Sequence, residues 1–226
     1  MKLKRPIGVF LFWLFFHSLY SQQLRFKQIT SEEGLSTNFV KCIMQDDRGF
    51  MWFGTQDGLN KYDGYQVKVF KNNPTDSSSI FCSDITTLRQ LREDIILIGT
   101  LEGLTFFNPV TEKFRHLNST DAKMNCRINA VIKQDEQHAL IGTEKGLFQL
   151  DISSGKITKT DFPAREVNVK CLALVNKQVL LGTYTEGLYR LKGQNAEKVE
   201  LLIPDYSEFK SEDIISITSI DQYGEK

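Results

Sequence analysis

Short, wholly apolar runs recur along the chain, each directly before a Gly-Thr pair. They occupy residues 51–53, 96–98, 139–141 and 179–181. A run of this length that is apolar at every position fits a strand buried on both faces. Beyond residue 21 the chain shows no sustained helical period with capping residues, so the runs predict an all-β protein.

Each Gly-Thr pair begins a longer repeat, in which Gly-Leu follows after two or three residues. The first glycines are spaced 45, 43 and 40 residues apart, a period that is typical of propeller blades. Each Gly-Leu pair is followed by a second short segment with large side chains and then by a turn, such as Asp63-Gly64 or Asn108-Pro109. This spacing predicts β-propeller blades of four antiparallel strands, with repeats centred near 54, 99, 142 and 182. The repeat positions are Gly54, Thr55, Gly58 and Leu59; Gly99, Thr100, Gly103 and Leu104; Gly142, Thr143, Gly146 and Leu147; and Gly182, Thr183, Gly187 and Leu188.

Packing explains all four positions of the repeat. The second glycine suits the positive φ of a tight hairpin. The first glycine lets neighbouring blades approach closely, and the threonine hydroxyl can bond to the turn backbone. A phosphate-binding loop is excluded, because it needs a following helix or a lysine after the second glycine.

A fifth, truncated repeat begins near residues 221–224, which match the turn at 46–49. We therefore expect about four and a half blades and an incomplete ring, within a propeller region over residues 22–226. Residues 24–29 resemble the fourth strands at 66–70 and 113–117. We expect them to be the strand that completes the last blade of a closed ring.

The first 21 residues have the pattern of a secretory signal peptide. Lys2, Lys4 and Arg5 precede an apolar run at 7–16 and a polar exit. The run is too short to span a bilayer, which takes about 20 residues. Cleavage after Ser21 and export are predicted.

Export makes the four cysteines relevant, because disulfides form in oxidising compartments. Cys42 and Cys171 occupy equivalent positions in separated repeats, too far apart to bridge. Cys82 and Cys126 precede strands in adjacent repeats, so their pairing stays open. The favoured interpretation is four buried thiols that act as small apolar side chains.

The charge balance argues against a nucleic-acid partner. The chain has 28 basic and 28 acidic residues, with no charge runs, whereas affinity for phosphate needs clustered Lys and Arg. With 41% hydrophobic and 25% charged residues, the chain has the composition of a globular protein.

The sequence contains no catalytic, metal or cofactor constellation. It lacks a repeated acidic pair, histidines at metal-ligand spacing and a nucleophile elbow. His116 and His138 have no catalytic partners in the pattern and are interpreted as surface or strand residues. The candidate ligand contact is Tyr184, in the longer fourth hairpin loop, where it could stack on a sugar or simply be solvated.

Residues 33–38, 46–55 and 57–64 resemble the first blade of the two-component regulator propeller, the exported N-terminal sensor region of bacterial hybrid histidine kinases. The likeness extends over the mature chain, although later blades depart from it. In those blades the position of Trp52 is taken by Leu97, Leu140 and Leu180.

The resemblance implies a ligand-sensing region without enzymatic activity of its own, in a periplasmic location. It implies a parent protein with further blades, a β-sandwich-like domain, an inner-membrane helix and a cytoplasmic histidine kinase, with homodimerisation possible. It also suggests a polysaccharide-derived oligosaccharide as the ligand. Two alternatives stay open: a stand-alone secreted propeller that acts as a protein- or carbohydrate-binding scaffold, and an enzyme with polar groups from several blades at the channel mouth.

Overall fold

The computed structural model describes residues 26–117, 125–160, 167–192 and 195–199, and these residues form four antiparallel sheets and no helix. Within each sheet the strands lie side by side in chain order. The first sheet is β1 (Val40–Gln45), β2 (Met51–Thr55), β3 (Gly58–Tyr62) and β4 (Val67–Phe70). The second is β5 (Ile85–Arg92), β6 (Ile95–Thr100), β7 (Leu104–Asn108) and β8 (Lys113–His116). The third is β9 (Ile128–Lys133), β10 (His138–Thr143), β11 (Gly146–Asp151) and β12 (Ile157–Lys159). The fourth is β13 (Val169–Val175), β14 (Gln178–Thr183), β15 (Leu188–Lys192) and β16 (Asn195–Lys198).

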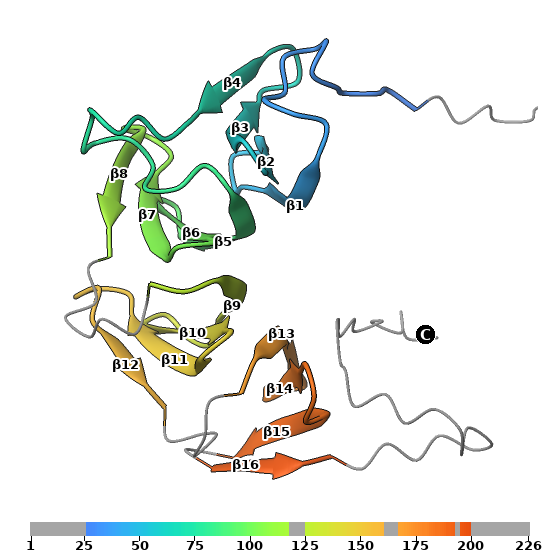
Figure 1. Cartoon of the computed structure of the whole chain (residues 1–226), viewed down its shortest axis with the longest axis vertical. Helices are drawn as coiled ribbons and strands as arrows, with labels where there is room; N and C mark the ends of the chain where they lie inside the picture. Colours follow the sequence, from blue (N-terminus) through green and yellow to red (C-terminus); the bar gives the residue numbers. More distant parts are fainter. Residues whose placement is uncertain (1–25, 118–124, 161–166, 193–194, 200–226) are drawn as a thin grey trace, which may run out of the picture.

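The four sheets follow one another along an open arc, with β1, β5, β9 and β13 on its inner side (Figure 1). These inner strands contact one another in sequence, β1 with β5, β5 with β9 and β9 with β13. The prediction of an all-β protein built from four-stranded propeller blades is confirmed. The expected signal peptide and fifth repeat lie outside the described residues.

The apolar core lies between the blades. One buried cluster includes Trp52 and Leu59 of the first blade with Ile96 and Phe107 of the second. Comparable clusters join the second blade to the third and the third to the fourth. Because each blade buries its face against the next, no single repeat provides a core of its own.

Two faces of the arc can be defined from the strand ends. The hairpin face carries the Gly-Thr to Gly-Leu hairpins, which join the second strand of each blade to the third. The turn face, at the opposite strand ends, carries the turns that join the first strand to the second. On the hairpin face, the residue after each motif threonine donates its N–H to the carbonyl before the inner strand, over 2.9–3.3 Å. The donor and acceptor pairs are Gln56 and Phe39, Leu101 and Asp84, Glu144 and Arg127, and Tyr184 and Asn168.

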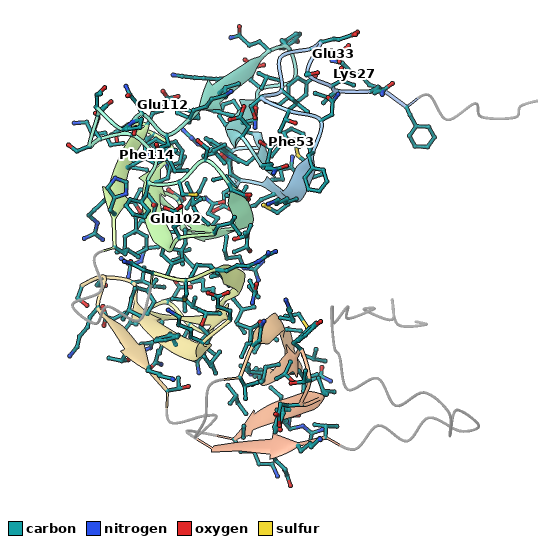
Figure 2. The ribbon with its side chains drawn as sticks, viewed as in Figure 1. Lys27, Glu33, Phe53, Glu102, Glu112 and Phe114 are labelled. Carbon is teal, nitrogen blue, oxygen red and sulfur yellow. The ribbon has the colours of Figure 1, made fainter. Side chains whose placement is uncertain are left out.

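The expectation that residues 24–29 complete the last blade of a closed ring stays a prediction. Residues 26–29 form no strand with the described blades. Lys27, which is labelled in Figure 2, lies near the first blade. Its Nζ donates a hydrogen bond to the hydroxyl of Tyr62 over 2.5 Å. The partner strand that this segment was expected to join belongs to a last blade, which is not among the described residues.

The hairpin between β13 and β14 stores backbone strain that a glycine would relieve. Asn176 and Lys177 have φ values of 50° and 63°, as in a type I′ turn, which prefers Asn-Gly. Lys177 is exposed, so its side chain adds little packing. We expect Lys177→Gly to raise the unfolding free energy by about 1 kcal/mol, measured by denaturant titration.

Asn176→Gly is the matched control for this prediction. Asparagine tolerates the left-handed region better than lysine, so this variant should gain less. Equal gains at both positions, or a loss for Lys177→Gly, would contradict the assignment of strain to Lys177.

Candidate functional site

The motif residues on the hairpin face serve the turns. Each motif threonine is fully buried and donates its hydroxyl to the carbonyl of the second glycine over 2.8–3.0 Å. The second glycines have φ between 86° and 143°, a region that favours glycine. These are the turn roles that the sequence predicts. The residues concerned are Thr55 with Gly58, Thr100 with Gly103, Thr143 with Gly146, and Thr183 with Gly187.

The first glycine of the motif allows close contact between blades. A Cβ on Gly54 would lie 2.6 Å from Ile85 Cγ2 of the next blade. The equivalent distance is 2.7 Å from Gly99 to Ile128 and 2.8 Å from Gly142 to Val169. The first glycines of the motif therefore serve the packing between blades, and any ligand would contact other residues.

Tyr184 lies on the hairpin face at the junction of the third and fourth blades. Its side chain is 50% exposed, and Lys170 Nζ lies 5.0 Å from its ring centroid. Nearby, Asn129 Nδ2 donates to Asn168 Oδ1 and to the carbonyl of Val169, each over 2.9 Å. The ring is accessible, with a cation over it and a polar surface beside it.

A pocket of about 410 Å³ lies on the turn face, where three successive blades meet. The first blade contributes Asp47 from the β1–β2 turn, and the second contributes residues 90–93 at the end of β5 and in its turn. The third blade contributes Lys133 and Glu136 from the end of β9 and its turn. Polar groups from several blades thus converge at one place.

The two cations that line this pocket, Arg92 and Lys133, each contact neighbouring protein groups. Arg92 Nη2 donates to the carbonyl of Glu136 over 3.1 Å and to Ser153 Oγ over 3.0 Å. Lys133 Nζ is 2.7 Å from Glu136 Oε1. Gln90 Oε1 accepts the N–H of Asp47 over 2.9 Å.

Sequence reasoning did not single out the pocket residues, although it contained a signal for them. In the first blade, the Asp-x-x-Gly turn begins at Asp46. That pattern is lost at 92–94 in the second blade and at 135–137 in the third. Residues from these altered turns line the pocket. The turns that lack the Asp-x-x-Gly pattern therefore indicated where the pocket lies. The repeated residues did not, because they build the scaffold.

The cysteines and histidines do not form a reactive centre. All four cysteines are thiols in the structure, including the pair left open, Cys82 and Cys126. Burial raises the pKa of the Cys42 thiol to about 12, so it is not a thiolate at neutral pH. His116 and His138 lie in different blades, on β8 and β10. Across the ranges described above, no three His, Cys, Asp or Glu side chains are grouped as a metal site.

His138 contacts a carboxylate at the turn that precedes β10. Its Nδ1 lies 3.0 Å from both carboxylate oxygens of Asp135. This hydrogen bond lowers the pKa of Asp135. Because Asp135 also accepts the N–H groups of Gln137 and His138 over 2.7 Å, it closes the turn.

Residues 34–57 match the family model of the two component regulator propeller. The resemblance to this family is confirmed. Histidine kinase P4 of Formosa agariphila is 48% identical over 81 residues, which make up 34% of this chain and 6% of that kinase. Over these 81 residues the chain is therefore similar to part of a histidine kinase, of which it spans a small share.

Two solved structures from B. thetaiotaomicron share the propeller architecture. One is the extracellular domain of a protein described as a hybrid two component system, with TM-score 0.67 and 24% identity. It is matched by 77% of this chain over 26% of its own length. The other is the extracellular domain of a protein described as a one component system, with TM-score 0.69 and 23% identity. Here 87% of this chain matches 27% of that domain, so the chain spans about a quarter of each.

No helix among the described residues has the length and hydropathy needed to cross a membrane.

Proposed function

We propose that the chain is the exported, ligand-sensing propeller region of a hybrid two-component sensor kinase. The observation that carries this proposal is the family match of the first blade, together with the identity to a histidine kinase. In this proposal the parent protein is anchored in the inner membrane, and the propeller lies in the periplasm behind a cleaved signal peptide. The extracellular domains with the same architecture support that location.

The ligand in this proposal is an oligosaccharide derived from a polysaccharide. The arrangement of the blades suits such a role, because a packed scaffold holds variable turns from several blades in fixed positions. In this proposal the chain itself carries out no catalysis: the motif threonines close the hairpins, and His138 contacts Asp135 within a turn. Catalysis belongs to the kinase portion of the parent.

A transcriptional experiment tests the sensing function. Transcripts are measured in the source bacterium after exposure to oligosaccharides from a panel of polysaccharides. The same measurement is made in a strain with an in-frame deletion of residues 22–226. The proposal expects a gene set that one polysaccharide induces in the wild type and not in the deletion strain. Induction that is unaffected by the deletion would overturn the sensing role.

A phosphorylation assay tests the absence of catalysis in this region. The purified chain is incubated with labelled ATP and examined for phosphohistidine. His116 and His138 should stay unmodified, because the first is held at Ser77 and Thr105 and the second at Asp135. Stoichiometric phosphohistidine on either residue would show that this region is itself part of a kinase.

A further inference from the structure

We propose that the hairpin face at the junction of the third and fourth blades is a binding site for an oligosaccharide, and that one sugar ring stacks on Tyr184. The oligosaccharide class rests on the proposed sensing function. The location rests on the backbone, the exposure and the hydrogen bonds of the residues around Tyr184.

The backbone beneath Tyr184 is fixed in the same way as in the other described blades. The N–H of Tyr184 donates to the carbonyl of Asn168 over 2.9 Å. The residues that make the equivalent bond in the other blades are Gln56, Leu101 and Glu144. Because the bond uses only backbone atoms, the hairpin does not require a particular side chain at this position. The scaffold therefore presents, at a defined place, a side chain that is free to serve recognition.

The ring of Tyr184 offers an accessible apolar surface. Half of its side chain is exposed, and Lys170 Nζ lies 5.0 Å from the ring centroid. This cation–π contact restrains the orientation of the ring without covering the exposed half. Tyrosine has only two side-chain torsions, so little conformational entropy is lost when a ligand stacks on it. The C–H face of a pyranose is the complementary surface, because it is apolar and nearly flat.

Two hydrogen-bond donors lie close to this ring. Asn129 Nδ2 donates to the carbonyl of Val169, which can only accept, so the orientation of the Asn129 amide is fixed. The same nitrogen donates to Asn168 Oδ1, which leaves Asn168 Nδ2 as an N–H donor. Neither Asn168 Nδ2 nor Lys170 Nζ makes a hydrogen bond or ion pair with another of the described residues. Both donors are therefore available to the hydroxyl oxygens of a ligand.

A flat apolar surface with donors at its edge matches the two kinds of surface on a sugar ring. The ring of Tyr184 takes the C–H face, and Asn168 and Lys170 donate to hydroxyl groups at the rim. The turn-face pocket lacks the first of these elements, because none of the described residues that line it is aromatic. The hairpin face is therefore the better surface for stacking a sugar.

Calorimetric titration of the purified chain tests for binding. The probes are the hexasaccharides of laminarin, xylan, starch and cellulose, which present pyranose rings in different linkages. We expect at least one of them to bind, and the tightest binder is then used for the variants. No binding of any probe would overturn the site.

Four variants locate the bound sugar. Tyr184→Ala removes the ring and should lower the affinity about tenfold, whereas Tyr184→Phe keeps the ring and should change it by about twofold or less. Asn168→Asp keeps the acceptor for Asn129 but removes the amide donor, and it should lower the affinity about fivefold. The matched control is Tyr65→Ala, because Tyr65 is an exposed tyrosine at the opposite strand ends, in the β3–β4 turn.

Tyr65→Ala should leave the affinity unchanged, and thermal melting of each variant verifies that the fold is retained. Unchanged affinity in Tyr184→Ala, or an equal loss in Tyr65→Ala, would overturn the placement of the ligand on the hairpin face.

The same variants in the full-length parent separate this site from the sensing function. Chromosomal Tyr184→Ala should reduce the induction that deletion of residues 22–226 abolishes. If the deletion abolishes induction while Tyr184→Ala neither weakens binding nor reduces induction, the sensing function stands and this site is wrong. If Tyr184→Ala weakens binding while the deletion leaves induction intact, the site stands and the sensing function is wrong.

Discussion

Replacement of Trp52 by alanine is expected to lower the unfolding free energy by about 3–5 kcal/mol. Trp52 is fully buried, and its ring centroid lies 5.3 Å from that of Phe107 in the second blade. Its Nε1 donates to Asp46 Oδ2 over 2.9 Å. The variant would leave both a cavity between two blades and a buried carboxylate oxygen without its donor, and each of these is destabilising. Equilibrium unfolding in denaturant measures the loss.

Two further variants divide this effect into its parts. Trp52→Phe keeps an aromatic ring but removes the indole N–H, and it should cost about 1–3 kcal/mol. Tyr65→Ala is the matched control, because the Tyr65 side chain is 95% exposed and its loss should change stability by about 0.5 kcal/mol or less. If Trp52→Ala were as well tolerated as Tyr65→Ala, the interface between the first two blades would not contribute to stability as described.

The contact between Trp52 and Asp46 also explains why the repeat pattern is clearest in the first blade. Asp46 is buried, and its Oδ1 accepts the N–H groups of Arg48 and Phe50 over 3.0 and 2.9 Å. One carboxylate thus closes the β1–β2 turn and holds the indole. Where leucine replaces tryptophan, no indole donor is available, and the turn sequence is free to change. In the third blade Asp135 closes the turn without an indole.

The strands and hairpins were predictable because their causes are local. An apolar run of three residues before Gly-Thr requires burial on both faces, and the second glycine supplies the positive φ of the hairpin. These features depend on neighbours within a few residues. The period of the repeat then implies stacked blades, which the clusters between the sheets confirm.

The pocket and the ion pairs between blades could not be predicted, because they join residues from different repeats. Lys61 and Lys68 of the first blade both contact Glu112 in the β7–β8 turn of the second. Lys41 pairs in the same way with Asp84. Which charged residues meet depends on the twist and spacing of neighbouring blades, and periodicity does not specify either. The same geometry places Asp47 beside the turns of the next two blades.

Substitution of Gly99 by alanine is expected to lower the unfolding free energy by about 3 kcal/mol, although it adds only a methyl group. A Cβ at this position would lie 2.5 Å from Thr87 Cγ2 and 2.7 Å from Ile128 Cγ2. Ile128 is fully buried at the start of β9, so relief of the second contact requires movement of the third blade. Close packing resists such movement. Thermal and denaturant unfolding measure the cost.

Two comparisons distinguish this contact from a general cost of losing a glycine. Gly64→Ala adds a Cβ that meets no heavy atom within 4 Å but lies at a φ of 100°, so it should show only the backbone strain, about 1 kcal/mol. Thr87→Ser removes the nearer of the two methyl groups and should recover part of the stability lost in Gly99→Ala, with the remainder due to Ile128. If Gly99→Ala cost no more than Gly64→Ala, the blades would be able to separate without penalty. The repeated first glycine would then need an explanation other than the close approach of neighbouring blades.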